Sequence, residues 1–193
     1  MTEDPIQIFQ NWYAEATTGS QLQHPKAVFV STISPEGISE ARFVALKAVS
    51  EKGFTFCSSL NSAKSIAIAF NSHVALTFWW DCIERQVRVK GIAKRISNED
   101  ADKYFKERHR DAQLTSIVSE QSALLKDPAR LEQKLHEVKR QFEGREIPRP
   151  DNWGGYCIKP ISIEFLKFQA NRFHHRILFT CNEGSWSRQL LQP

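Results

Sequence analysis

Hydrophobic residues recur along this chain with two different spacings, and each spacing predicts its own kind of element. In residues 5–17, Ile6, Phe9 and Trp12 are three positions apart, which is typical of one face of a helix. Gly19 follows as a residue expected to end that helix. Other stretches are rich in β-branched residues that alternate with polar ones, which predicts strands.

Five strands are expected first, then a helical segment, then more strands. The expected strands are 27–33, 38–49, 54–58, 73–80, 84–96, 155–158, 161–168, 173–181 and 186–191. The expected helices are 5–17, 62–71 with Ser62 as N-cap, 98–110, 117–125 and 128–142. Because the helices are segregated from a meandering antiparallel sheet, the pattern favours a mainly β fold, a β-barrel with peripheral helices. We expect one domain over 1–193, with an N-terminal helix in 1–20 and a helical insert at 98–145.

Composition narrows the class of protein without choosing a function. The chain has 193 residues, 41% of them hydrophobic and 25% charged, and a formal net charge of +4. Such mild basicity suits phosphorylated small molecules as well as nucleic acid. The four cysteines form no C-x-x-C pair, so neither a disulfide framework nor a metal site is indicated. The acidic start and the absence of a long apolar run predict a cytoplasmic, soluble protein.

Two arginines and two histidines fall within residues 172–176, inside an otherwise strand-like run. If residues 172–176 form a regular strand, Arg172, His174 and Arg176 point to one face. Such a face, flanked by apolar residues, suits an anionic planar ligand. The alternative is a solvated strand face on a basic protein.

Three further segments offer hydrogen-bond donors to an anion. Residues 58–64 combine hydroxyls, a helix N-terminus and Lys64, which together suit a phosphate, although a capped helix with an exposed lysine has the same pattern. Gln86 offers an amide to the edge of a heterocycle, or simply belongs to a half-exposed strand. Tyr104 and Arg108, four positions apart, either grip a phosphate or stack on each other at a helix surface.

No single motif identifies a family, but the ordered set does. The matching segments are RFVALK (42–47), FCSSLNSAK (56–64), ERQV (84–87), YFKERHRD (104–111), SEQS (119–122), WGGY (153–156), IEF (163–165) and RFHHR (172–176). In this order and spacing they resemble the pyridoxine/pyridoxamine 5′-phosphate oxidase family. The resemblance covers roughly residues 27–193.

The resemblance implies a split β-barrel homodimer that binds FMN between its subunits. It implies oxidation of pyridoxine or pyridoxamine 5′-phosphate to pyridoxal 5′-phosphate, with O2 as acceptor and H2O2 as product. The positions implied for FMN are Arg42, Phe43, Val44, Cys57, Ser58, Lys64, Gln86, Gln121, Ser122, Leu166 and Arg176. Those implied for the substrate are Lys47, Tyr104 and Arg108 at its phosphate, with Arg172 and His174 as catalytic residues over its ring.

The chain departs from the family pattern at a few of these positions. Ala63 stands where the family usually has a second basic residue, Ala112 where it has a serine, and Leu166 where it has a tryptophan. Two other functions therefore remain open: a phenazine-biosynthesis-like oxidase of the same fold, and a split-barrel protein that binds flavin or pyridoxal phosphate without turnover. A nucleic-acid or membrane partner is not expected.

Overall fold

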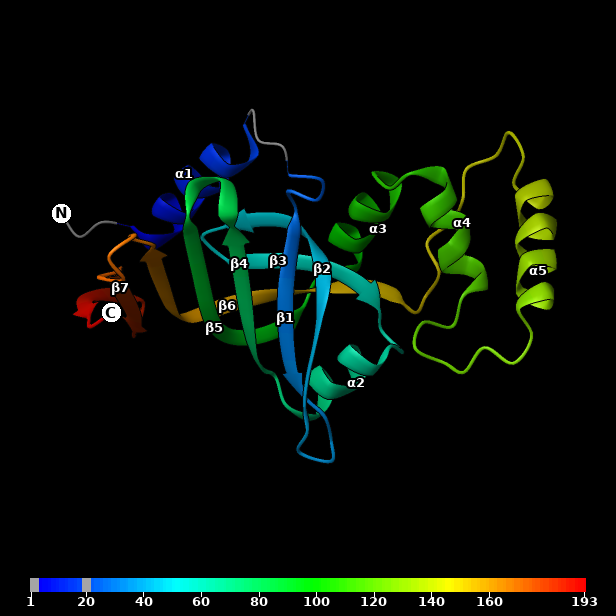
Figure 1. Cartoon of the computed structure of the whole chain (residues 1–193). Coiled ribbons are helices and arrows are strands. Elements are labelled where there is room, and N and C mark those ends of the chain that lie inside the picture. The colour runs from blue at the N-terminus through cyan, green and yellow to red at the C-terminus, as the bar shows by residue number, and fades with distance from the viewer. Residues whose placement is uncertain (1–3, 19–21) are drawn as a thin grey trace.

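The computed structural model describes residues 4–18 and 22–193, and eight antiparallel strands dominate it (Figure 1). The strands are β1 Ala27–Ile33, β2 Ser39–Ser50, β3 Gly53–Ser59, β4 His73–Trp80, β5 Arg85–Arg95, β6 Trp153–Lys167, β7 His175–Asn182 and β8 Ser185–Leu191. Their order is β3-β2-β1-β4-β5-β6-β7-β8, and a further pairing of β3 with β6 closes the first six into a barrel. The expected mainly β barrel with peripheral helices is confirmed.

The barrel interior is filled by alternate residues of each strand. In β4, Val74, Leu76 and Phe78 are buried while their neighbours are more exposed, as a period of two requires. Helix α1 (Pro5–Thr17) closes one end and buries Phe9, whose ring lies 4.8 Å from that of Phe54. The side chain of Asp4 caps this helix by accepting a hydrogen bond from the backbone N–H of Ile6 at 2.9 Å.

The remaining helices lie outside the barrel. They are α2 Ala63–Phe70, the short 3₁₀ helix η1 Asp81–Ile83, α3 Asn98–Lys106, α4 Arg110–Val118 and α5 Pro128–Gln141. In Figure 1, α3, α4 and α5 lie on the opposite side of the barrel from β7. A second hydrophobic cluster, which includes Phe105, Leu114 and Val138, joins these helices to Trp153 at the start of β6.

Several predicted elements match closely. The bounds 5–17, 27–33 and 73–80 are confirmed, and 128–142 differs from α5 by one residue. Ser62 is the N-cap residue of α2, but its side chain makes no capping hydrogen bond. Gly19, the expected helix end, and residues 1–3 lie outside the described residues. No helix among the described residues is long and apolar enough to cross a membrane.

Two helix predictions were wrong. The expected helix 98–110 ends at Lys106, a new helix spans 110–118, and the expected helix 117–125 is largely turn and coil. A side-chain contact stabilises the break: Gln113 of α4 donates to the Phe105 carbonyl, eight residues earlier, at 2.8 Å. Beyond α4, Ser122 has a φ of 75°, which no helix accommodates.

The expected separation of strands 155–158 and 161–168 was also wrong, because β6 runs through Pro160 without a break. The pairing of β5 with β6 shifts register where Gly91 lies opposite Pro160. A β-bulge is one of the few places where a sheet tolerates proline. A Cβ added at Gly91 would lie 2.5 Å from the Lys159 carbonyl oxygen, so the close approach needs a glycine.

Candidate active site

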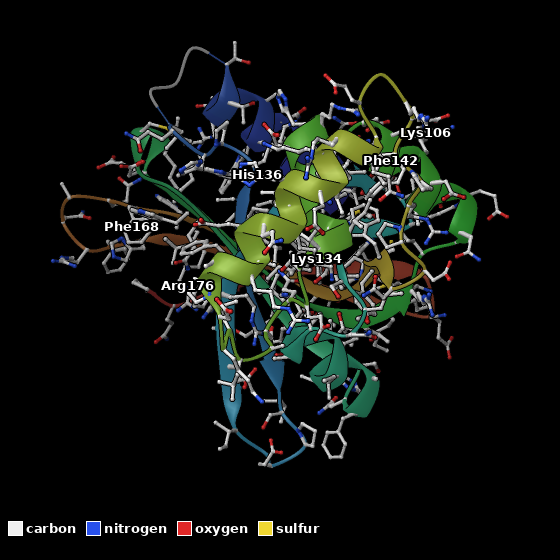
Figure 2. All side chains as sticks on the ribbon, turned by 90° about the vertical axis from the view of Figure 1, so that its right-hand side faces the viewer. Lys106, Lys134, His136, Phe142, Phe168 and Arg176 are labelled. Carbon is white, nitrogen blue, oxygen red and sulfur yellow. The ribbon has the colours of Figure 1, made fainter. Side chains whose placement is uncertain are left out.

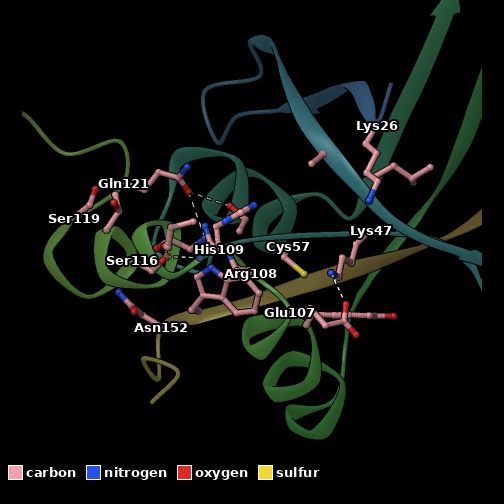
Figure 3. Close-up of a pocket in the computed structure, with 18 residues that line it drawn as sticks. Lys26, Lys47, Cys57, Glu107, Arg108, His109, Ser116, Ser119, Gln121 and Asn152 are labelled. Atoms are coloured by element: carbon pink, nitrogen blue, oxygen red, sulfur yellow. Dashed lines mark hydrogen bonds and ion pairs between the residues drawn. The ribbon is translucent and has the colours of Figure 1, made fainter. Parts of the chain in front are cut away.

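A cavity of about 550 Å³ opens where the barrel meets α3 and α4. Its wall combines β2, β3, the two helices and the start of β6 (Figure 3). The expected site residues that line it are Lys47, Cys57, Ser58, Tyr104, Arg108 and Gln121. Residues far apart in the sequence therefore meet at one hollow.

Lys47 reaches this cavity from an irregular point of β2. The pairing of β2 with β3 shifts register between Leu46 and Ala48, and such a bulge changes the direction of the side chain within it. Lys47 Nζ lies 2.6 Å from a carboxylate oxygen of Glu107 and 5.3 Å from the centroid of the Tyr104 ring. The lysine is therefore held beside the cavity by an anion and an aromatic face.

Arg108 enters the cavity from the segment between α3 and α4. Its guanidinium lies 5.1 Å from the centroid of the Trp153 ring, and one nitrogen donates a hydrogen bond to Ser116 Oγ. Burial lowers the pKa of Arg108 from its ordinary value, yet an arginine stays cationic at any physiological pH. None of the ion pairs among the described residues includes Arg108, so its charge meets neutral groups.

Cys57 lies between these two cations in Figure 3. Burial raises the pKa of its thiol to about 11, and the charges of Lys47 and Arg108 oppose that rise. Lys47 and Arg108 therefore both lie close enough to Cys57 to affect its pKa. The thiol itself stays protonated and presents a small, weakly polar surface to the cavity.

Lys64 forms the second cationic point, next to the cavity wall. Only 7% of this residue is exposed, and its ammonium contacts Ser58 Oγ at 3.1 Å, Ser62 Oγ at 3.2 Å and Gln121 Oε1 at 3.3 Å. Burial lowers the pKa of Lys64, and the charge of Arg42 lowers it further. Among the described residues no carboxylate pairs with Lys64. A buried cation with only neutral partners suits an anionic ligand.

The other expected residues of β2 before Lys47 are Arg42, Phe43 and Val44, and their surroundings differ. Arg42 donates to Thr32 Oγ1 at 2.6 Å and pairs with Glu40 at 2.6 Å, so its charge is partly balanced. Phe43 is 71% exposed on the outer face of the barrel. Phe43 and Val44 border a neighbouring hollow of about 640 Å³, which shares Lys26 and Ala45 with the main cavity.

Ser122 closes the network from the segment after α4. Its hydroxyl accepts a hydrogen bond from the backbone N–H of Ala63 at 3.2 Å, at the start of α2. The amide oxygen of Gln121 lies 3.2 Å from Ser58 Oγ as well as near Lys64. Hydrogen bonds of Gln121 and Ser122, in the segment SEQS (119–122), thus join this segment to β3 and to the N-terminus of α2.

A second group of expected residues lies elsewhere on the same chain. Gln86, Leu166 and Arg176 form one row across β5, β6 and β7, because Leu166 pairs with both of the others. Arg176 binds the buried carboxylate of Glu164 at 2.8 Å and the Gln192 carbonyl at 3.0 Å. In Figure 2, Phe168 and Arg176 lie on the opposite side of the molecule from Lys106 and Phe142.

The prediction that 172–176 begins as a regular strand was wrong. β7 starts only at His175, and Arg172 has a φ of 65° in an exposed turn. Arg172 and His174 therefore belong to a loop rather than to one strand face. His174 Nδ1 accepts the backbone N–H of Gln169 at 3.1 Å, and its ring lies 4.8 Å from that of Phe168.

The structure thus divides the expected site into two groups within one chain. The first group is the residues that line the cavity, with Lys64, Arg42 and Ser122 next to its wall and Phe43 and Val44 at the neighbouring hollow. The second group, on β5, β6, β7 and the loop before β7, is Gln86, Leu166, Arg172, His174 and Arg176. Sequence reasoning missed Glu107, Ser116 and Glu164, which are partners of Lys47, Arg108 and Arg176. The position of Ser116, eight residues after Arg108, continues the spacing that singled out Tyr104 and Arg108, and so gave a usable signal.

Comparison with known families finds a match over nearly the whole chain. A family model described as "Pyridoxamine 5′-phosphate oxidase" matches residues 15–142, and one described as "Pyridoxine 5′-phosphate oxidase C-terminal dimerisation region" matches residues 153–193. A pyridoxine/pyridoxamine 5′-phosphate oxidase of Rubrobacter xylanophilus is 43% identical over 98% of this chain and 87% of its own length. The protein of that name from Flavobacterium johnsoniae is 41% identical over 98% of this chain and 89% of its own length.

Solved structures show the same architecture. PhzG from Burkholderia lata 383, in complex with tetrahydrophenazine-1-carboxylic acid, has a TM-score of 0.93 at 25% identity, over 98% of this chain and 93% of that chain. A pyridoxamine 5′-phosphate oxidase-related, FMN-binding protein from Nostoc punctiforme has a TM-score of 0.79 at 16% identity, over 100% of this chain and 99% of that chain. The split-barrel fold is thereby confirmed.

Proposed function

The chain belongs to the pyridoxine/pyridoxamine 5′-phosphate oxidase family, and on this premise we propose how its residues divide the work. The protein is an FMN-dependent oxidase that converts pyridoxine or pyridoxamine 5′-phosphate to pyridoxal 5′-phosphate, reducing O2 to H2O2. The observation that carries the assignment of residues is the pair of separate cationic points at one cavity. Lys64 forms one point, and Lys47 with Arg108 forms the other.

We assign the FMN phosphate to the point at Lys64. Its buried ammonium has only neutral oxygen partners among the described residues, and Arg42 adds a second positive charge. The N-terminus of α2 adds the positive end of a helix dipole at this point, although the Ala63 N–H is bonded to Ser122. Ser58, Gln121 and Ser122 add polar groups, so the residues present fit a phosphorylated flavin.

We assign the substrate phosphate to Lys47, Tyr104 and Arg108. The two cations and the phenol border one hollow, and Arg108 is held in place by Trp153 and Ser116. A guanidinium binds two phosphate oxygens at once, which fixes the direction of the substrate as well as its affinity. Glu107, bound to Lys47 before substrate arrives, is displaced when the phosphate takes that cation.

The protein is a homodimer, and its dimerisation region at 153–193 contains Arg172, His174 and Arg176. These residues lie outside the cavity of their own chain. We therefore propose that the loop 168–174 of one protomer completes the cavity of the other, with FMN between them. Exposed Phe43 and Trp79 on the outer barrel face supply apolar surface for this contact.

FMN held by these residues would supply the redox chemistry, as the acceptor of a hydride equivalent from the substrate carbon that O2 then reoxidises. The protein's own residues orient that carbon. Because His174 Nδ1 already accepts a hydrogen bond, the neutral ring carries its proton on Nε2 and donates to the substrate. Arg172 supplies a fixed positive charge at the same end of the substrate, so the pair aligns the ring while Arg108 and Lys47 hold the phosphate.

We further propose that the chain works as a single domain over 1–193. The helical insert at 98–145 contributes Tyr104 and Arg108 to the cavity, and it packs on the barrel through Trp153. A cytoplasmic location stays a prediction.

The deciding experiment is a visible spectrum of the purified protein, followed by addition of pyridoxamine 5′-phosphate without oxygen. We expect a yellow protein whose flavin absorbance bleaches on addition of substrate and returns with air. A protein that binds FMN but keeps its colour would contradict the proposed activity.

One observation favours a second candidate, an oxidase of phenazine-type substrates, because the PhzG structure superposes with a TM-score of 0.93. Such a substrate carries a carboxylate rather than a phosphate, so it does not account for both Lys47 and Arg108 beside Tyr104. Bleaching by a tetrahydrophenazine carboxylate, with none by pyridoxamine 5′-phosphate, would favour this second function.

A further inference from the structure

Ser116 lies on the wall of the main cavity, on α4, and its hydroxyl meets the guanidinium of Arg108 (Figure 3). We propose that Ser116 is a ligand of the substrate phosphate and a determinant of specificity for phosphorylated substrates. This inference rests on the proposed function, because it names a further residue of the same site. Three observations carry it.

The first observation is the contact with Arg108. The guanidinium packs on the ring of Trp153 at 5.1 Å, and Ser116 Oγ accepts one of its N–H groups. An anion that binds the remaining N–H groups of Arg108 comes close to Ser116 Oγ. The serine therefore stands beside the position that the phosphate must take.

The second observation is that this hydroxyl has a proton to give. Ser116 Oγ donates at present to the Ala112 carbonyl at 2.9 Å, one helical turn earlier. That carbonyl belongs to α4 and also receives a backbone N–H, as each carbonyl inside a helix does. Rotation about the Cβ–Oγ bond moves the proton to a phosphate oxygen, while the oxygen still accepts from Arg108.

The third observation concerns the residues of α4 that lie next to Ser116. Ala112 also lines the cavity, but its methyl group offers no hydrogen bond. Thr115, exposed on the same helix, bonds through its hydroxyl to the Asp111 carbonyl at 2.8 Å. Of these three residues on one turn of α4, Ser116 is the one whose hydroxyl contacts Arg108.

The test compares two unreactive ligands on the FMN-loaded dimer, 4-deoxypyridoxine 5′-phosphate and 4-deoxypyridoxine, by isothermal titration calorimetry. We expect Ser116→Ala to weaken the phosphorylated ligand about tenfold, since loss of one hydrogen bond to a charged group has that size. The affinity for the ligand without phosphate should change less than about twofold. Thr17→Ala is the matched control: it removes a helix hydroxyl that also bonds to the carbonyl one turn earlier, that of Tyr13 at 2.8 Å, but lies outside the cavity lining, and it should leave both affinities as in the wild type.

A second variant separates a phosphate ligand from a residue that only positions Arg108. Ala112→Ser in the Ser116→Ala background returns a hydroxyl to the wall one turn away, and we expect it to recover part of the lost phosphate affinity. Equal loss for both ligands, or no loss for either, overturns the inference while the proposed function stands. A wild-type protein that binds the phosphorylated ligand no better than the other overturns the inference and the substrate assignment together.

Discussion

Replacement of Lys64 by methionine should weaken FMN while leaving the folded protein at least as stable as before. The side chain keeps its length, but the positive charge is lost at a residue that is 7% exposed. A charged hydrogen bond to a phosphate contributes about 1.5 to 3 kcal/mol, so the dissociation constant should rise about tenfold to a hundredfold.

The stability of the protein without FMN should move in the opposite direction or not at all. The ammonium has three neutral oxygen partners and no carboxylate among the described residues, and burial already lowers its pKa. Removal of an uncompensated buried cation relieves a desolvation cost, while Ser62 keeps its bond to the Ser59 carbonyl at 2.8 Å. We expect the urea midpoint of the FMN-free variant to equal or exceed that of the wild type.

Fluorescence titration of the FMN-free protein with FMN and with riboflavin measures the effect directly. Only FMN carries the phosphate, so the loss should appear with FMN and be absent with riboflavin. Lys90→Met removes an exposed lysine on β5 and is the matched control, expected to alter neither affinity. If Lys64→Met weakens FMN and riboflavin equally, or neither, the assignment of Lys64 to the phosphate is refuted.

Four further results are expected. Arg172→Ala should lower turnover about a hundredfold while FMN stays bound, and unchanged kinetics with pyridoxine 5′-phosphate would remove Arg172 from the site. Ala63→Arg, beside the cationic point at Lys64, should tighten FMN about tenfold in the same fluorescence titration, unless the site is already saturated with donors, which an unaltered dissociation constant would show. Glu107→Gln should free Lys47 and lower the KM for pyridoxamine 5′-phosphate a few-fold, since a solvent-exposed ion pair is weak, and a raised KM would contradict that assignment. Because the pKa of Cys57 is raised to about 11, its thiol stays protonated as the pH rises through its ordinary value of 9.0. At pH 9 about 1% of it is thiolate instead of about half, so alkylation of Cys57, followed by peptide mass spectrometry, should be at least tenfold faster in urea than in the native protein.

The sequence predicts the barrel well where burial alone determines the pattern. β1 and β4 alternate cleanly and their bounds were found, since one face of each is buried. The pattern fails where a tertiary contact overrides it. Pro160 signals a strand break, but the bulge opposite Gly91 accommodates it, and the break after α3 is stabilised by a contact from Gln113 that no local pattern reveals.

The sequence predicts which residues belong to the site, but not how they are arranged in space. The family resemblance points to Lys64, Arg108 and Arg172 alike, but tertiary packing brings only the first two to one cavity of the chain: Arg108 lines it, and Lys64 contacts its lining residue Gln121. The loop that carries Arg172 could not be recognised, because a residue other than glycine with a φ of 65° breaks the alternation on which the strand prediction depended. Glu107 and Ser116 were missed because their roles depend on contacts with Lys47 and Arg108. A sequence pattern does not show which side chains contact each other.

Each site takes Lys47, Tyr104 and Arg108 from one protomer and the loop 168–174 from the other. A complementation assay examines this arrangement: Arg108→Ala and Arg172→Ala dimers, each with about a hundredth of wild-type activity or less, are unfolded together, refolded as a mixture and assayed. We expect recovery of about a quarter of wild-type activity, because half of the dimers are mixed and each mixed dimer regains one intact site. A mixture no more active than its two components would contradict this arrangement, since it would mean that both residues serve the same protomer's site.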